Sequence, residues 1–259
     1  MDRSLRRIGS DWEALAEADP LWAILTDPGT RGGKWDVEAF FESGRREVRL
    51  LLDELEEHDQ LPAPRETLET QGHALDFGCG VGRLTQGLCR HFRGAVGIDI
   101  SPTMVRLANE HNAFATRCRY MHNDAPHLDV LGDERFDLCY SFIVLQHMPW
   151  ESAQGYLAAM AARLTPAGRL VFQLPAEAKA PPARTRWHAA ARRVLPAPLR
   201  RLRHRLFGDP LPLRMQMHAT PRLEVEAFLE TLGLAVQYAR PSLAAGAGYE
   251  GFLYVAGRA

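Results

Sequence analysis

The stretch His73-Ala-Leu-Asp-Phe-Gly-Cys-Gly-Val-Gly-Arg83 joins a short apolar run to a turn with glycine at three alternate positions. Glycine lacks a Cβ atom, so a ligand can lie directly against the backbone at Gly78, Gly80 and Gly82. A helix is predicted after the turn, over 84–92, and its first N–H groups can receive an anionic group such as a carboxylate. The alternative is a loop whose glycines serve packing alone.

A carboxylate stands 17 residues beyond Gly82, at Asp99, where a second apolar run ends. In a right-handed strand-helix-strand unit this carboxylate projects beside the glycine turn, where two vicinal ribose hydroxyls can donate to it. A helix-capping role before Pro102 is the alternative for Asp99. Together, the turn and the acid point to a nucleoside-bearing ligand far more specifically than either feature alone.

Short apolar runs alternate with helical patterns along the middle of the chain. Each run is bounded by Gly, Pro, Asp or Asn, as buried parallel strands tend to be. This alternation predicts an α/β fold with a doubly wound sheet. The predicted strands are 73–77, 95–100, 118–122, 136–142 and 169–174; a helix follows Pro149, and a further helix at 221–232 precedes two strand-like runs at 234–239 and 252–256.

An amphipathic helix is predicted ahead of the sheet, over 35–58, with Asp36 as its N-cap. Gly44 lies inside this helix, where glycine costs about 1 kcal/mol relative to alanine. Its presence indicates either a close approach by another backbone or a ligand, or a tolerated surface position. The segment 60–72 contains two prolines and is interpreted as a linker.

The spacing of the glycines separates two nucleotide-binding families. A dinucleotide fold requires G-x-G-x-x-G, but counting from Gly78 or from Gly80 places Arg83 or Thr85 where the third glycine belongs. An acidic residue followed by G-x-G-x-G, as in Asp76-Phe-Gly-Cys-Gly-Val-Gly82, resembles the first motif of the class I S-adenosylmethionine-dependent methyltransferases. The resemblance covers roughly residues 70 to 175, through Asp99, Asn123-Asp124-Ala125, the run 136–148 and the passage 164–172.

This resemblance implies a Rossmann-like, mostly parallel sheet of seven strands, with the last strand antiparallel, an N-terminal helical extension and a helical insertion after the fifth strand. It also implies S-adenosyl-L-methionine as the cofactor and assigns roles to particular residues. Gly78, Gly80 and Gly82 would line the methionine portion, Asp76 would order the loop and Asp99 would hold the ribose. Ile100 and Met104 would flank the adenine, Asp124 would accept from its amino group with Ala125 beside it, and Ser141 would face the methionine end. For Asp124 an Asx-turn after a strand is the alternative.

Two histidines are candidates for catalysis. A hydroxyl or ammonium acceptor must lose a proton during methyl transfer, and a neutral histidine can take it. His147 follows the fourth predicted strand at the sheet edge where open α/β folds bind ligands, and His218 precedes the helix at 221–232. Each also has a structural interpretation: in many of the methyltransferases that the chain resembles, the histidine at the position of His147 is structural, and His218 is an ordinary helix-start residue.

A basic segment follows the fifth predicted strand: nine Lys or Arg residues and no acid lie between Lys179 and Arg205. It is interpreted as a lid over an anionic acceptor, a membrane-surface contact or a nucleic-acid patch, or as a solvated helical face. The methyltransferases that this chain resembles commonly insert substrate-recognition elements at this place, and the resemblance therefore favours the lid. The chain is accordingly divided into a helical cap (1–69), a cofactor-binding core (70–178), a basic lid insertion (179–218) and the C-terminal part of the core (219–259).

Composition narrows the class of protein. The 31 basic and 32 acidic residues of this 259-residue chain give a formal charge of -1, too small for a global field that attracts nucleic acid or membranes. The four cysteines form no C-x-x-C pair, so no metal site is predicted, and no apolar run approaches the roughly 20 residues of a membrane span. The charged start of the chain is unlike a signal peptide, which predicts a cytoplasmic protein with reduced thiols.

The acceptor is expected to be a small molecule. Methyltransferases of exocyclic base amines carry D/N/S-P-P-Y/F after the fourth strand, whereas here Ser141 is followed by Phe-Ile-Val. The sequence therefore favours a small-molecule acceptor, methylated preferably on oxygen. The stretch Trp35-Asp-Val-Glu-Ala-Phe-Phe-Glu-Ser-Gly44 ahead of the core resembles bacterial stand-alone enzymes that modify secondary metabolites or saccharides, which implies an acceptor of that kind. An anionic acceptor and a homodimer are further expectations. The alternatives are a protein of the same fold that binds the cofactor without transferring its methyl group, in a regulatory or cyclase-like role, and, more distantly, an NAD-linked oxidoreductase.

Overall fold

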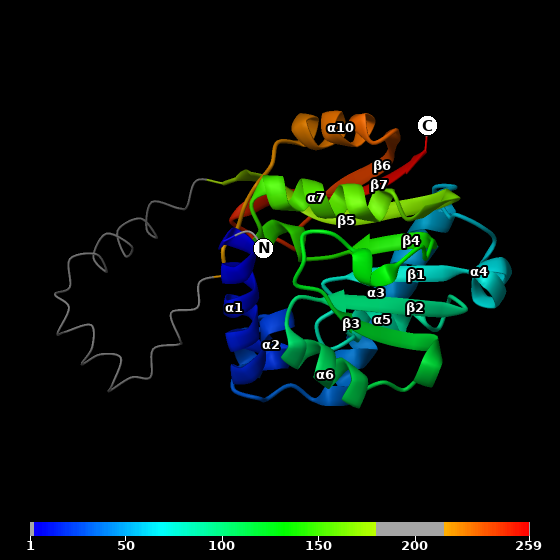
Figure 1. Cartoon of the computed structure of the whole chain (residues 1–259). Coiled ribbons are helices and arrows are strands. Elements are labelled where there is room, and N and C mark those ends of the chain that lie inside the picture. Colours follow the sequence, from blue (N-terminus) through cyan, green and yellow to red (C-terminus); the bar gives the residue numbers. More distant parts are fainter. Residues whose placement is uncertain (1–2, 180–214, 259) are drawn as a thin grey trace.

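The structure, a computed structural model, describes residues 3–179 and 215–258. A seven-stranded sheet in the order β3-β2-β1-β4-β5-β7-β6 forms its centre (Figure 1). Strands β1 to β5 run parallel, and β7 pairs antiparallel with β5 and β6. The doubly wound α/β sheet with an antiparallel last strand is thus confirmed. The strands are β1 (His73–Phe77), β2 (Gly94–Asp99), β3 (Cys118–His122), β4 (Phe136–Ser141), β5 (Leu164–Ala178), β6 (Leu234–Ser242) and β7 (Tyr249–Arg258).

Helices cover both faces of the sheet (Figure 1). Successive side chains of a strand point to opposite faces, so Leu75 and Phe77 join an apolar cluster with α7 and α10, while Ala74 joins one with α3, α4 and α5. The helices are α1 (Arg3–Ala18), α2 (Pro20–Ile24), α3 (Val37–Glu57), α4 (Arg65–Gln71), α5 (Arg83–Leu88), α6 (Pro102–Glu110), α7 (Trp150–Ala161) and α10 (Arg222–Thr231). Single 3-10 turns are η1 (Pro28–Thr30), η2 (Ala115–Arg117), η3 (Asp129–Leu131) and η4 (Leu145–His147).

The carboxyl ends of β1, β2 and β4 meet at one edge of the sheet, because β1 lies between the other two strands and parallel to both. The N-terminal helices α1 and α2 lie against this edge. A Cβ atom on Gly9 of α1 would meet the Ile100 side chain at 3.3 Å, and one on Gly80 would meet Ile24 of α2 at 2.5 Å. Helices from the start of the chain therefore cover the ends of the central strands.

Gly44 of α3 marks the closest approach between α3 and α5. A Cβ atom at this position would lie 2.3 Å from the carbonyl oxygen of Arg83. The first of the two interpretations of Gly44, a close approach by another backbone, is confirmed. This contact brings α3 alongside the start of the helix that follows the glycine turn.

Substituting alanine for Gly44 is expected to lower the free energy of unfolding by about 1 to 3 kcal/mol. The clash with a backbone oxygen must be relieved by moving a helix, and this outweighs the gain of about 1 kcal/mol in helix propensity. Urea unfolding monitored by circular dichroism measures the difference. Leu50→Ala is the control on the same helix because its side chain is 57% exposed, and it should change the stability by less than about 0.5 kcal/mol. A Gly44→Ala variant as stable as wild type would show that α3 can shift freely.

Several predicted boundaries were wrong; β6 and β7, for example, extend to Ser242 and over Tyr249–Arg258 rather than over 234–239 and 252–256. The segment 60–72 is not a plain linker, because it contains α4. Strand β5 begins at Leu164 rather than at 169, since Leu164 pairs with Phe136 ahead of a bulge in the ladder. Helix α5 ends at Leu88 rather than at 92. Most of the predicted basic insertion, 180–214, lies outside the described residues.

Candidate functional site

The glycine turn after β1 is held in a conformation that favours glycine. Gly78, Gly80 and Gly82 have φ values of 80°, 53° and 86°, in the region where a Cβ atom strains the backbone. The N–H groups of Gly78 and Cys79 donate to the carbonyl of Ile98, at 2.8 and 2.9 Å. The turn therefore folds back onto the end of β2, and the side chains of Val144, Ile24 and Tyr120 lie against Gly78, Gly80 and Gly82.

Asp99 lies against this turn, as predicted from the sequence. Its Oδ2 atom accepts the N–H of Gly80 at 2.8 Å, and its Oδ1 atom accepts the N–H of Ser101 at 2.9 Å. Burial raises the pKa of Asp99, and the backbone N–H groups oppose that shift. Because an ionised carboxylate offers about four lone-pair sites, each oxygen retains capacity for a further donor.

Asp76 lies beneath the turn and is 1% exposed. One of its carboxylate oxygens accepts the hydroxyl of Thr85 at 2.5 Å, which ties the last residues of β1 to the first turn of α5. Burial raises the pKa of Asp76 to about 7, and the Thr85 hydrogen bond and the charge of Arg83 only partly offset it. The role of Asp76 in ordering the loop stays a prediction, which this hydrogen bond supports.

Asp76 should make the protein less stable as the pH rises. Its folded-state pKa lies above the unfolded value of 3.8, so the native state binds more protons between about pH 4 and pH 7. The free energy of unfolding should fall across that window with a contribution of up to about 1.4 kcal/mol per pH unit. In Asp76→Asn this contribution is absent, and urea unfolding at pH 5 and pH 7 should show a smaller difference than in wild type. Asp133→Asn, at an exposed position, serves as the control; an unchanged difference in Asp76→Asn would contradict the expectation.

The other residues assigned to the cofactor divide into two groups. Ile100 follows Asp99 directly, and Ser141 is buried at the end of β4, where its hydroxyl donates to the carbonyl of Phe77 at 3.2 Å. Asp124 is exposed and Ala125 half-buried in the loop after β3. Met104, by contrast, is only 1% exposed and belongs to the apolar cluster beneath α1 and α2. Its contact with the adenine stays a prediction, as do the roles of the other four.

Helix α1 contributes residues to this edge that sequence reasoning did not single out. Glu13 accepts hydrogen bonds from the hydroxyls of Ser101 and Thr103, at 2.5 and 2.6 Å, and from the N–H of Thr103 at 3.2 Å. The carboxylate therefore fastens α1 to the connection between β2 and α6. The spacing of Ile8, Trp12 and Leu15 was the available signal, because it places one apolar face on a helix.

The two candidate histidines are brought together. Nδ1 of His147 lies 2.8 Å from the carbonyl oxygen of Gln216, and its Nε2 lies 3.2 Å from the side-chain nitrogen of Gln146. A carbonyl can only accept and an amide nitrogen can only donate, so Nδ1 carries the proton and Nε2 presents its lone pair. The N–H of His218 donates to the carbonyl of Gln146 at 2.8 Å. Burial lowers the pKa of His147, and the nearby His218 lowers it further.

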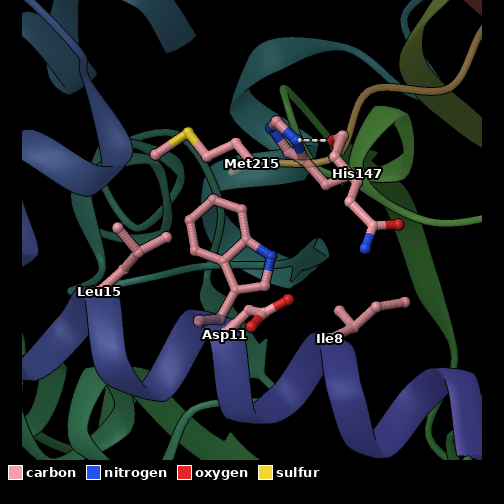
Figure 2. A pocket seen from close by; sticks show the side chains of 7 residues that line it. Ile8, Asp11, Leu15, His147 and Met215 are labelled. Atoms are coloured by element: carbon pink, nitrogen blue, oxygen red, sulfur yellow. Dashed lines mark hydrogen bonds between the residues drawn. The ribbon is translucent and has the colours of Figure 1, made fainter. Parts of the chain in front are cut away.

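A cleft opens between this network and α1. Figure 2 shows His147 and Met215 on one side and Ile8, Asp11 and Leu15 on the helix opposite. The cleft has a volume of only about 20 Å³ in this structure, so an acceptor can enter it only when the facing side chains move apart. Trp12 contacts the imidazole of His147 edge to face, with ring centroids 5.1 Å apart. It is lined mostly by apolar side chains, with a neutral imidazole at its wall and Asp11 at its rim.

Part of this chain, including the edge of the sheet described above, is similar to known proteins. Residues 74–168 match the family model described as a methyltransferase domain. Those residues include the glycine turn, Asp99 and His147. Over this range the chain is similar to the class I S-adenosylmethionine-dependent methyltransferases.

Several curated methyltransferases resemble this domain. The chain is 31% identical over 103 residues to the ubiquinone biosynthesis O-methyltransferase of Coxiella burnetii, which covers 39% of this chain and 42% of that protein. It is 32% identical over 130 residues to the trans-aconitate 2-methyltransferase of Paracidovorax citrulli, covering 49% of this chain and 48% of the relative. The chain thus spans less than half the length of these relatives, and the likeness is to the methyltransferase domain.

The fold extends further than the sequence similarity. The magnesium protoporphyrin IX methyltransferase of Synechocystis, solved with bound S-adenosylhomocysteine, superposes with a TM-score of 0.64 at 17% identity. That match covers 99% of this chain and 100% of the other. At this identity the likeness concerns the fold, and it includes the helices outside the matched domain.

The residues at the edge of the sheet fit S-adenosylmethionine, the cofactor of this domain. The glycine turn has no Cβ atoms of its own at three positions, although the side chains of Val144, Ile24 and Tyr120 lie against it in this structure. Asp99 keeps lone pairs for the two ribose hydroxyls after binding Gly80 and Ser101. Ile24 of α2 lies directly over Gly80, so the N-terminal helices form the outer wall.

Three further observations bear on the class of protein. In the ranges 3–179 and 215–258, no helix has the length and apolar character needed to cross a membrane. Within the same part of the chain, no three His, Cys, Asp or Glu side chains are grouped so that they could hold a metal ion. All four cysteines are buried as free thiols.

Proposed function

We propose that this methyltransferase domain transfers a methyl group from S-adenosylmethionine to an oxygen of a small-molecule acceptor that binds in the cleft between α1 and His147. The observation that carries the proposal is the state of His147: a neutral imidazole at the carboxyl edge of the sheet, with its Nε2 lone pair directed toward the Gln146 amide. The names of the ubiquinone O-methyltransferase relatives support oxygen as the methylated atom.

The residues of the cleft account for the steps that the protein must supply. When bound, S-adenosylmethionine provides an electrophilic methyl group. The acceptor hydroxyl replaces the Gln146 amide as the partner of Nε2 on His147, which takes the hydroxyl proton as the oxygen is methylated. The bond from Nδ1 to Gln216 holds the ring in the tautomer that this step requires. Trp12, Ile8 and Leu15 exclude water and align the acceptor.

The side chains that line the cleft indicate the chemical class of the acceptor. Among the described lining residues the charged side chain is Asp11, and the others are apolar, aromatic or neutral. This lining favours an acceptor with an apolar ring system and a hydroxyl, such as a secondary metabolite. Six further expectations stay predictions from the sequence. They are an anionic acceptor, a saccharide acceptor, a basic lid over 179–205, action of His218 as a second base, assembly as a homodimer and a cytoplasmic location.

The test is transfer of labelled methyl. Host extract incubated with the protein and cofactor carrying a ¹³C-methyl group should yield, by mass spectrometry, a small product heavier by one labelled methyl group. Protein denatured by heat is the blank. Binding of S-adenosylhomocysteine without any labelled product would favour the alternative of a protein that binds the cofactor but does not transfer its methyl group.

A further inference from the structure

A second cleft lies on the flank of the domain, where α3 faces the end of α5. Glu42, Arg45, Arg46 and Arg49 are spaced at three- and four-residue steps along α3, so they share one face of the helix. Glu69 of α4 and Arg90 with His91 after α5 complete the lining. The cleft has a volume of about 340 Å³ and opens to solvent. Every side chain that lines this cleft is polar and ionisable.

The cleft carries an excess of positive charge. Arg45 is already neutralised, since it forms ion pairs with Glu38 and with Glu42, the latter at 2.5 Å. Arg46, Arg49 and Arg90 form no ion pair and no side-chain hydrogen bond with any described residue. Three guanidinium groups from two separate elements are therefore available to one ligand. Guanidinium groups bind phosphate and carboxylate oxygens through paired N–H donors.

This flank is distant from the reacting edge of the sheet. Helix α5 begins at the glycine turn and runs back along β1, so Arg90 follows its far end, just before β2 starts at Gly94. Helix α3 runs beside α5 in the same direction: Gly44 contacts Arg83, and Val48 contacts Gly87 four residues further on. Arg49 is therefore positioned toward the amino ends of the strands, away from Asp99 and His147.

The side chains that line this second cleft also indicate which kind of anion can bind there. Neither Trp, Tyr nor Phe lines the described cleft, so it lacks the stacking surfaces that proteins use for nucleobases. It has no apolar side chain to insert into a lipid layer. A concave site with three unpaired arginines suits a compact anion with several charged oxygens.

We propose that the cleft between α3 and the end of α5 is a ligand site for a diphosphate-type oxyanion, held by Arg46, Arg49 and Arg90. The site is separate from the cofactor and acceptor sites, and it does not depend on the proposed transfer reaction. A ligand bound there contacts α3, the helix that also holds Arg83 at the start of α5 through Glu47, at 2.7 Å.

Isothermal titration calorimetry of the full chain with inorganic pyrophosphate tests this site. The protein is first saturated with S-adenosylhomocysteine, so that the cofactor site is occupied. We expect one pyrophosphate per chain, and inorganic phosphate should bind at least tenfold more weakly because it spans fewer arginines. Arg49→Gln and Arg90→Gln should each weaken pyrophosphate binding at least tenfold, since each removes charge-assisted hydrogen bonds.

Arg106→Gln is the matched control, because it removes an arginine from α6, where that residue pairs with Glu110 instead of facing the cleft. Its affinity for pyrophosphate should stay within twofold of wild type. Since the substituted arginines are exposed, circular dichroism should show unchanged folding in every variant. The proposal is overturned if wild type does not bind pyrophosphate at millimolar concentration, if Arg106→Gln weakens binding as much as Arg49→Gln, or if saturation with S-adenosylhomocysteine abolishes binding.

Discussion

Replacing Asp99 with alanine is expected to weaken the binding of S-adenosylhomocysteine by at least 100-fold. Two ribose hydroxyls would lose a charged acceptor, and each such hydrogen bond contributes about 1.5 to 3 kcal/mol. The substitution also removes the acceptor of the Gly80 N–H group, which holds the glycine turn against the end of β2. Isothermal titration calorimetry at constant pH and salt measures the change in Kd.

Two variants separate the ribose contact from a general loss of structure. Asp133→Ala removes an exposed carboxylate elsewhere on the surface and should leave the Kd unchanged. Asp99→Asn keeps one acceptor oxygen and should fall between wild type and Asp99→Ala. Wild-type affinity in Asp99→Ala would place the ribose away from the end of β2 and would remove the central assignment of the cofactor site.

The second large effect is expected in His147→Ala, which should slow methyl transfer by roughly 100-fold or more, the usual contribution of a general base. Binding of S-adenosylhomocysteine should stay within about threefold of wild type, because the contacts of His147 are to Gln146, Gln216 and Trp12 rather than to the glycine turn. The measurement is kcat for the acceptor identified by labelled transfer, alongside calorimetry of cofactor binding.

The pH profile distinguishes a base from a structural histidine. Burial lowers the pKa of His147 from its usual 6.5, so the neutral, active form persists to a pH below 6.5. The rate should be constant above about pH 7 and should decline only in more acidic solution. Full activity in His147→Ala, or loss of cofactor binding together with activity, would assign His147 a structural role.

The core of the sheet was predictable because buried parallel strands have continuous runs of apolar residues in the sequence. The bounds of β1 and β3 agree with the sequence prediction, and Asp99 lies beside the glycine turn as expected from a right-handed connection. Gly44 was also informative, since an interior helical glycine is retained where two backbones approach closely.

The parts that escaped prediction depend on contacts between distant residues. Gln216, which orients His147, is 69 residues away along the chain, and Glu13 meets Ser101 across 88 residues. The local pattern of apolar and polar residues does not indicate which residues far apart in the sequence will come into contact. Helix α4 was missed for a different reason: the two prolines ahead of it suggested a break, but proline is well tolerated just before and at the start of a helix.

Helix α1 touches both halves of the site, with Glu13 fastened to the connection after β2 and Trp12 lying against His147. One helix therefore contacts both the connection that follows Asp99 and the candidate base. Any outward swing of this element separates an indole from an imidazole, and indole emission depends on such neighbours. Trp12 is one of five tryptophans in the chain, so the part of the fluorescence change that is lost in Trp12→Phe is expected to report movement of α1 when donor or acceptor binds, and stopped-flow measurements can time the two events separately.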